Sequence, residues 1–176
     1  MREIEVKYAV PDREALLLAL KSRGVALSEP VRQDDQAYAP AGWTPGDGKR
    51  GVPFVRLRTV EGRHTFTLKR PDLNEQSCTE RETVVEDRDQ MHEAIMLMGY
   101  APTVRVAKHR RIGVLDGAEL CVDDLEGVGT FLELERIVSE EADEASVQTE
   151  LAAVVAGLGI ACERTTETYD ALVRRG

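Results

Sequence analysis

The chain has 176 residues and a formal net charge of −9 at pH 7, with 31% charged and only 5% aromatic residues. This length suits one domain with a substantial core, which we expect to span residues 1–176. The acidic balance argues against broad affinity for nucleic acid or for an anionic membrane, because binding to phosphate groups needs an exposed basic surface.

The predicted elements begin with a strand over residues 1–8, in which charged and apolar residues alternate. Leu16, Leu17 and Leu20 then follow helical spacing, and Gly24 is a typical helix stop. Strand patterns follow at 31–38, 53–60, 64–70 and 77–86. The Gly- and Pro-rich residues 39–53 predict a mobile loop, and Glu61-Gly62-Arg63 predicts the turn of a hairpin.

The second half of the chain continues the same mixture of helices and strands. A helix carrying Met91 and Ile95 should stop at Gly99, and residues 103–137 predict three or more further strands. The final third is helical, with a short terminal helix that Thr168 could cap. Strands outnumber helices, so we expect an α+β protein with one large antiparallel sheet.

Cysteine usage and hydropathy indicate the compartment. Cys78, Cys121 and Cys162 are widely spaced and form no Cys-x-x-Cys pair, which predicts free thiols instead of a zinc site. No apolar run approaches membrane-spanning length, and the sequence starts with a charged strand instead of a signal peptide. We therefore expect a cytoplasmic protein that binds neither membranes nor nucleic acid.

Charged residues recur at spacing i, i+2 along the predicted strands, and such residues share one face of a strand. The first strand places Glu3, Glu5 and Lys7 on one face, and the later pairs are Arg56 with Arg58, Glu80 with Glu82, Lys108 with Arg110, and Glu133 with Glu135. A solvated sheet face explains one strand of this kind. Because so many of them would crowd a whole face with charge, we expect a barrel of about eight strands whose interior they line.

A charged interior is stable only when its charges are paired, hydrated or bound to ions. Carboxylates bind hard divalent cations, whereas Arg and Lys bind phosphate oxygens, and a metal–triphosphate complex engages both kinds of side chain. The pattern therefore predicts a polyphosphate site inside the barrel.

The opening Glu3-Ile4-Glu5-Val6-Lys7 resembles the Glu-x-Glu-x-Lys motif of the CYTH, or triphosphate tunnel metalloenzyme, superfamily. Further segments resemble the family in the same order, and they are Asp35–Tyr38, Val55–Arg58, Thr67–Lys69, Glu80–Glu82, Lys108–Arg110, Val122–Glu135 and Thr168–Leu172. The resemblance covers nearly the whole chain. It implies a closed or nearly closed antiparallel eight-stranded β-barrel with flanking helices.

The resemblance also implies roles for individual residues. One or two Mg²⁺ or Mn²⁺ ions would be held by Glu3, Glu5, Glu133 and Glu135, with Asp123, Glu80 and Glu82 assisting. The triphosphate would be bound by Lys7, Arg56, Arg58, Lys69, Lys108 and Arg110. Tyr38 and Lys69 could form a catalytic dyad in which the lysine lowers the pKa of the tyrosine. In the alternative, Tyr38 only packs at the tunnel mouth and Lys69 is one more phosphate ligand.

The implied activity is hydrolysis of a triphosphate, either inorganic tripolyphosphate, thiamine triphosphate or a nucleoside triphosphate. One alternative is a class IV adenylyl cyclase, which the layout around Gly99-Tyr100 resembles, although the His-Phe element that precedes Glu3 in some cyclases is absent. A second alternative is a non-catalytic module that binds triphosphates or polyphosphate, which the intact Glu-x-Glu pairs disfavour. The resemblance also makes a homodimer reasonable, and the terminal helix could act as a lid or simply pack.

Overall fold

The computed structural model describes residues 2–72 and 76–175. Its strands are β1 (Arg2–Val10), β2 (Val31–Pro40), β3 (Phe54–Val60), β4 (Arg63–Pro71), β5 (Ser77–Val85), β6 (Tyr100–Leu115), β7 (Ala118–Leu125), β8 (Gly129–Val138) and β9 (Glu163–Thr165). Its helices are α1 (Arg13–Ser22), the 3-10 turn η1 (Pro45–Asp47), α2 (Arg88–Leu97), α3 (Glu144–Ala156) and α4 (Tyr169–Arg175). The predicted strands and helices are confirmed, and η1 and β9 are additions to them.

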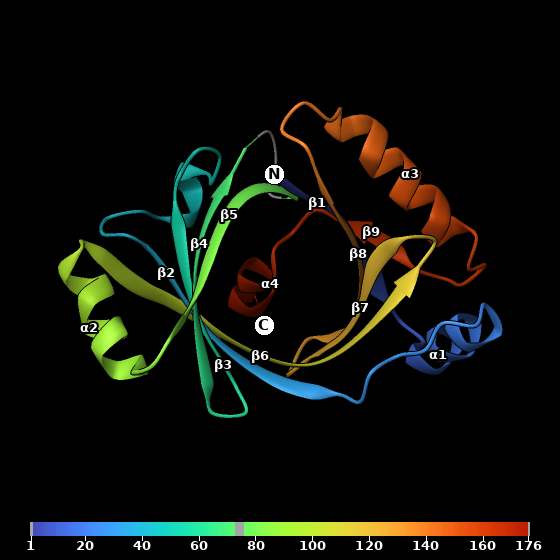
Figure 1. Ribbon diagram of the computed structural model, residues 1–176, viewed down its shortest axis with the longest axis horizontal. Coiled ribbons are helices and arrows are strands. Elements are labelled where there is room, and N and C mark those ends of the chain that lie inside the picture. The colour runs from blue at the N-terminus through green and yellow to red at the C-terminus, as the bar shows by residue number, and fades with distance from the viewer. Residues whose placement is uncertain (1, 73–75, 176) are drawn as a thin grey trace.

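Strands β1 to β8 close into an antiparallel barrel, which Figure 1 shows nearly end-on. The order around the wall is β5-β4-β3-β2-β6-β7-β8-β1, and β1 pairs with β5 to complete the ring. That last contact is short, with Glu3 opposite Cys78 and Ile4 opposite Ser77. β9 extends the sheet beside β1. The prediction of an α+β fold with a closed eight-stranded barrel is therefore confirmed for the described residues.

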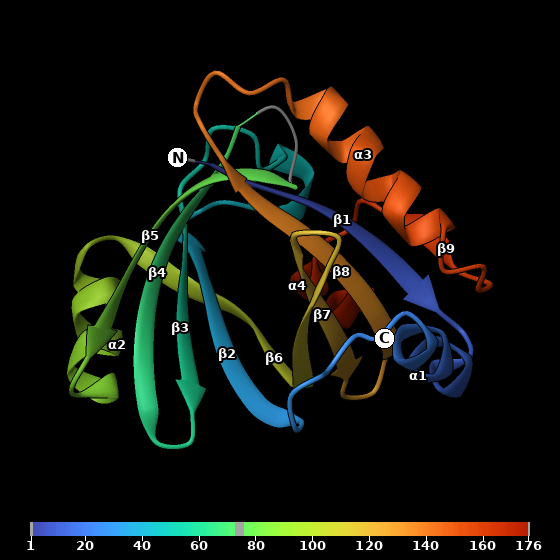
Figure 2. The same ribbon diagram turned by 45° about the vertical axis from the view of Figure 1, so that its right-hand side comes forward.

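The main hydrophobic core lies outside the barrel wall and not within it. Ile4 and Val6 of β1 alternate with the charged residues of that strand and are fully buried. They belong to one apolar cluster with Leu20 of α1 and Leu151 of α3, and Figure 2 shows both helices beside β1 and β8. Because the helices cover the apolar outer face, the inner face of the wall is left for polar side chains.

The helices begin where the sequence offers a capping side chain. The carboxylates of Asp12, Asp87 and Asp143 each accept a hydrogen bond from a backbone N–H in the first turn of α1, α2 and α3 respectively. The β3–β4 hairpin turns through Glu61 and Gly62, both with positive φ, as a two-residue connection requires. Among the described residues, no helix has the length and apolar character needed to cross a bilayer.

Candidate active site

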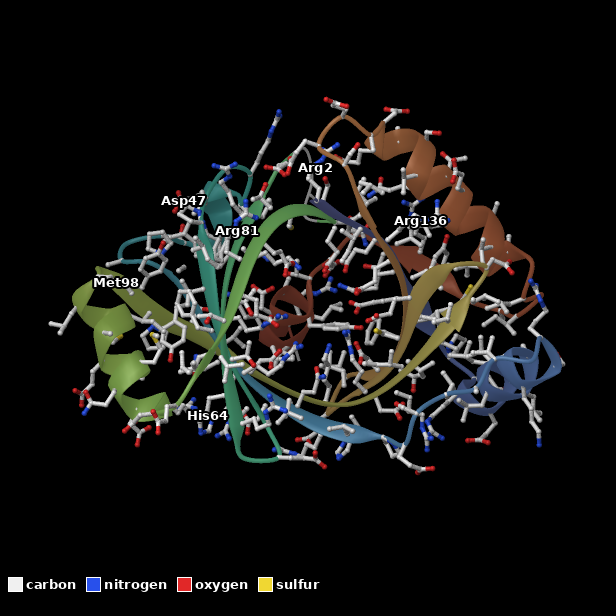
Figure 3. The ribbon with its side chains drawn as sticks, viewed as in Figure 1. Arg2, Asp47, His64, Arg81, Met98 and Arg136 are labelled. Atoms are coloured by element: carbon white, nitrogen blue, oxygen red, sulfur yellow. The ribbon has the colours of Figure 1, made fainter. Side chains whose placement is uncertain are left out.

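A cavity of about 400 Å³ lies inside the barrel. It is lined by all the predicted phosphate-binding cations, namely Lys7, Arg56, Arg58, Lys69, Lys108 and Arg110. It is also lined by most of the predicted metal ligands, namely Glu3, Glu5, Glu80, Glu82, Glu133 and Glu135. Polar side chains fill the interior of the ring in Figure 3, whereas the labelled Met98 lies at the outer end of α2.

Three carboxylates gather on the β1–β8 side of the cavity. Glu5 faces Glu135 across the β1–β8 ladder, and one carboxylate oxygen from each of Glu3, Glu5 and Glu135 lies within 4.8 Å of the others. Burial, together with neighbouring carboxylates, raises the pKa of Glu3 to about 7 and that of Glu135 to about 8. If all three carboxylates were ionised, they would carry more negative charge than their surroundings neutralise, and their oxygen donors suit a hard divalent cation.

Other carboxylates hold the cations of the tunnel in place. Glu133 lies 3.2 Å from the Lys7 ammonium and also pairs with Arg110. Asp123 accepts hydrogen bonds from Lys108 Nζ at 2.8 Å and from Arg110 Nε at 2.7 Å. Burial alone would raise the pKa of Glu133, but Lys7 and Arg110 hold it well below its ordinary value. Glu133 and Asp123 therefore remain charged and orient the cations.

Strands β2 to β5 carry a similar set of pairs. Asp35 accepts two hydrogen bonds of 2.7 Å from the guanidinium of Arg58. Lys69 lies 2.5 Å from Glu80 and 3.7 Å from Glu3. Arg56 donates to Thr67 at 3.1 Å and to Glu82 at 3.4 Å. The sequence indicates Asp35 only as part of a motif. The β2–β3 register places it opposite Arg58, so its carboxylate holds that guanidinium in position.

Positive charge is concentrated around Lys108. This lysine is almost fully buried, and burial together with the nearby Arg110 lowers its pKa to about 8. A bound anion would relieve this crowding, because it offsets both charges at once. The tunnel thus has an acidic side around Glu135 and a basic side around Lys108, which is the arrangement that a metal–phosphate complex needs.

The terminal helix α4 lies inside the outline of the ring in Figure 1 and contacts β6. The hydroxyl of Tyr169 donates to Asp123 at 2.8 Å. The ring of Tyr169 lies 4.2 Å from the Lys7 ammonium and 4.6 Å from that of Lys108. Lys49 from the loop before β3 holds the helix by donating to Thr168 at 2.5 Å and to Asp170 at 3.1 Å.

The sequence offered unequal signals for these additional cavity residues. Thr168–Leu172 had a recognisable motif and was expected near a tunnel opening. Lys49 lies in a Gly- and Pro-rich segment without strand or helix periodicity, so no pattern indicated that it would line the cavity.

The predicted dyad of Tyr38 and Lys69 is not formed. Tyr38 is fully buried in an apolar cluster with Leu57 and Ile95, and its hydroxyl lies 2.7 Å from His92 Nδ1 on α2. It therefore faces out of the barrel, away from the cavity that Lys69 lines. Tyr38 lies three residues after Asp35, which lines the cavity, so ordinary strand alternation places these two side chains on opposite faces of β2. Glu80 and Glu3 also raise the pKa of Lys69 despite its burial, so this lysine stays protonated.

Several known proteins are similar to this chain in sequence or fold. The family model of the CYTH domain matches residues 1–169. A protein of Methanocaldococcus jannaschii that is provisionally named an adenylate cyclase is 27% identical over 162 residues, covering 91% of each chain. The adenylate cyclase CyaB of Aeromonas hydrophila is 25% identical over 173 residues, covering 97% of this chain and 87% of the relative.

A solved structure from Hippeastrum shares the fold with a TM-score of 0.64 and 18% identity, covering 100% of this chain and 96% of that one. It is described as an adenylyl cyclase candidate that reveals a dominant triphosphatase activity. Because the CYTH domain model matches nearly the whole length of the chain and the strands close into an antiparallel barrel, the chain belongs to the CYTH domain family.

Proposed function

We propose that this protein is a divalent-metal-dependent phosphohydrolase that acts on a triphosphate bound inside the barrel. One observation carries the proposal: the carboxylates of Glu3, Glu5 and Glu135 and the cations around Lys108 and Arg110 line the same cavity of about 400 Å³. The Hippeastrum protein, with its dominant triphosphatase activity, supports this choice.

The acidic side of the tunnel would hold Mg²⁺ or Mn²⁺ through the oxygens of Glu3, Glu5 and Glu135. When bound, such a cation neutralises phosphate charge and orients an attacking water. Glu133 and Asp123 would keep their present pairs and so fix the positions of Lys7, Lys108 and Arg110.

The basic side would bind the phosphate oxygens. Arg56, Arg58 and Arg110 each present a guanidinium to the cavity, and a guanidinium binds two phosphate oxygens at once. Lys7, Lys69 and Lys108 supply point charges between them. Because phosphoryl transfer has little covalent chemistry for a protein to perform, this positioning and charge stabilisation would supply most of the rate.

An adenylyl cyclase is the second candidate, since both of the curated relatives carry that name. In that reaction the ribose 3′-hydroxyl of ATP attacks the α-phosphorus and releases pyrophosphate. The same metal and cation set would serve both reactions, and the position of the triphosphate along the tunnel would decide between them.

The test is to incubate the purified protein with Mg²⁺ or Mn²⁺ and, separately, tripolyphosphate, thiamine triphosphate and ATP, and to identify the products by mass. Metal-dependent release of orthophosphate is the expected result. Cyclic AMP with pyrophosphate would replace the proposal with the cyclase. Saturable binding without turnover of any of them would instead indicate a binding module.

A further inference from the structure

β7 carries a cysteine on the inner face of the barrel wall. Cys121 lies two residues from Asp123, and its partner across the β7–β8 ladder is Glu133. Residues opposite each other on neighbouring strands point to the same side of a sheet. The thiol of Cys121 therefore shares the interior face with the carboxylates of the site, although it is fully buried behind the cavity surface.

The sulfur lies close to two of those carboxylates. Cys121 Sγ and one oxygen from each of Glu133 and Glu135 lie within 4.8 Å of one another. Glu135 also belongs to the Glu3–Glu5–Glu135 group. Two groups of ligand atoms thus adjoin each other and share one carboxylate, but only one of them contains sulfur.

Within the described part of the chain, Cys121 and Glu135 have no ion-pair or hydrogen-bond partner that would compete with a cation. Cys121 is a free cysteine, and across residues 2–72 and 76–175 no hydrogen bond is formed by its thiol and no ion pair by Glu135. Glu133 is different, since its two oxygens already face Lys7 and Arg110. The positive charge of a cation beside Cys121 would therefore be neutralised chiefly by the Cys121 thiolate and the Glu135 carboxylate.

Burial and the two glutamates raise the pKa of the Cys121 thiol above its ordinary value, so in the metal-free protein it is a protonated, unreactive group. A coordinating metal deprotonates a thiol outright, and the proton is released to solvent. Sulfur donors favour Zn²⁺, Cd²⁺ and Co²⁺, whereas Mg²⁺ and Ca²⁺ select oxygen.

We propose that Cys121, Glu133 and Glu135 form a second cation position, which takes a thiophilic divalent cation such as Zn²⁺ or Cd²⁺. It adjoins the oxygen-only position of Glu3, Glu5 and Glu135. The chain thereby distinguishes two classes of cation within one tunnel. This inference needs no triphosphate chemistry and so goes beyond the proposed function.

The test is a titration of the metal-free full-length protein with Cd²⁺ and Co²⁺, followed by the thiolate-to-metal charge-transfer band in the ultraviolet. The three cysteines allow matched variants. Cys121→Ser removes the proposed donor, and the double variant Cys78→Ser/Cys162→Ser leaves Cys121 as the remaining thiol. The wild type and the double variant should gain the band, and Cys121→Ser should not.

The affinities for Cd²⁺ and Mg²⁺ should respond differently to the loss of the Cys121 thiol. In Cys121→Ser the Kd for Cd²⁺ should rise about 10–100-fold, while the Kd for Mg²⁺ should change by no more than about twofold because its ligands are oxygens. A band that persists in Cys121→Ser, or that is missing from the double variant, would overturn the inference. Should Cys121→Ser fail to fold, the double variant still decides, since its remaining thiol is unaltered.

Assaying Mg²⁺-dependent release of orthophosphate on the same samples separates this inference from the proposed function. Turnover without a charge-transfer band would leave the function standing and remove the thiolate site. A band without turnover would leave the thiolate site standing and remove the hydrolase.

Discussion

At the residue scale, the carboxylates of the tunnel differ in how well they are paired. Asp35 and Asp123 each accept two hydrogen bonds from one guanidinium. The cations beside Glu3 and Glu5 are farther away, with Lys69 at 3.7 Å and Lys7 at 3.6 Å respectively. A paired carboxylate fixes a cation, whereas a poorly paired one has oxygen atoms available for a metal ion.

The double substitution Glu3→Gln/Glu5→Gln tests the role of the poorly paired carboxylates. It removes two negative charges with almost no change of shape, so metal-dependent turnover should fall by about 100-fold or more. Turnover is measured as orthophosphate release at several Mg²⁺ concentrations, with a thermal melt to verify folding. The exposed Glu29 provides the control, and Glu29→Gln should behave as wild type. Undiminished metal-dependent turnover in the double variant would disprove the metal assignment.

At the element scale, α1 and α3 hold the barrel together from outside. Two of the four leucines of α1, Leu18 and Leu20, test this, because Leu20 is fully buried whereas Leu18 is 68% exposed. Leu20→Ala should cost roughly 2–5 kcal/mol of unfolding free energy, and Leu18→Ala less than about 0.5 kcal/mol. Urea denaturation measures both. Equal losses would show that the outer cluster is not the core we describe.

α4 sets a different constraint, since the ring of Tyr169 occupies one side of both Lys7 and Lys108. A phosphate group and the ring compete for the same two cations. An ammonium–aromatic contact contributes about 0.5–2 kcal/mol, so Tyr169→Ala should lower the Kd for tripolyphosphate by roughly 3–30-fold. Calorimetric titration in Mg²⁺ measures the change.

Tyr169→Phe is the matched control for this experiment, because it keeps the ring and removes only the hydroxyl that bonds Asp123. Its Kd should stay near that of the wild type. A weaker affinity in Tyr169→Ala would mean that the ring helps to bind the ligand instead of competing with it.

At the scale of the whole molecule, the charged interior makes stability depend on pH. Glu3 and Glu135 have folded-state pKa values of about 7 and about 8, above the ordinary 4.5. The folded state therefore binds protons more tightly than the unfolded chain, and stability falls as pH rises from about 4.5 to 8. Above pH 8, Lys108 has the opposite effect: because its pKa in the folded protein is lowered to about 8, its contribution to stability increases as the pH rises further.

The metal-free protein should accordingly melt several degrees lower at pH 8 than at pH 5.5, at roughly 2–4 °C per kcal/mol for a chain of this size. Calorimetry at the two pH values measures the difference. Saturating Mg²⁺ should reduce it, because a cation favours the charged carboxylates. In the variant Glu3→Gln/Glu135→Gln the melting temperature should depend less on pH. A wild-type melting temperature that rises toward pH 8 would contradict the prediction.

The sequence by itself determined the barrel and most of its lining. A period of two is the geometric consequence of an extended backbone, so the charges at Glu3, Glu5 and Lys7 had to share a face. Repetition of that pattern on further strands indicated closure. The Glu61–Gly62 turn is also a local feature, and it too was predicted from neighbouring residues.

Only the tertiary structure decided which charges neutralise each other. The resemblance pairs Tyr38 with Lys69, yet Tyr38 lies on the outer face of β2, where its hydroxyl contacts His92 of α2. Glu133 and Glu135 look equivalent in sequence, but two cations reach the first and none pairs with the second in the described part of the chain. Strand alternation is fixed by backbone geometry, whereas ion pairing depends on which residues the register of eight separate strands brings together.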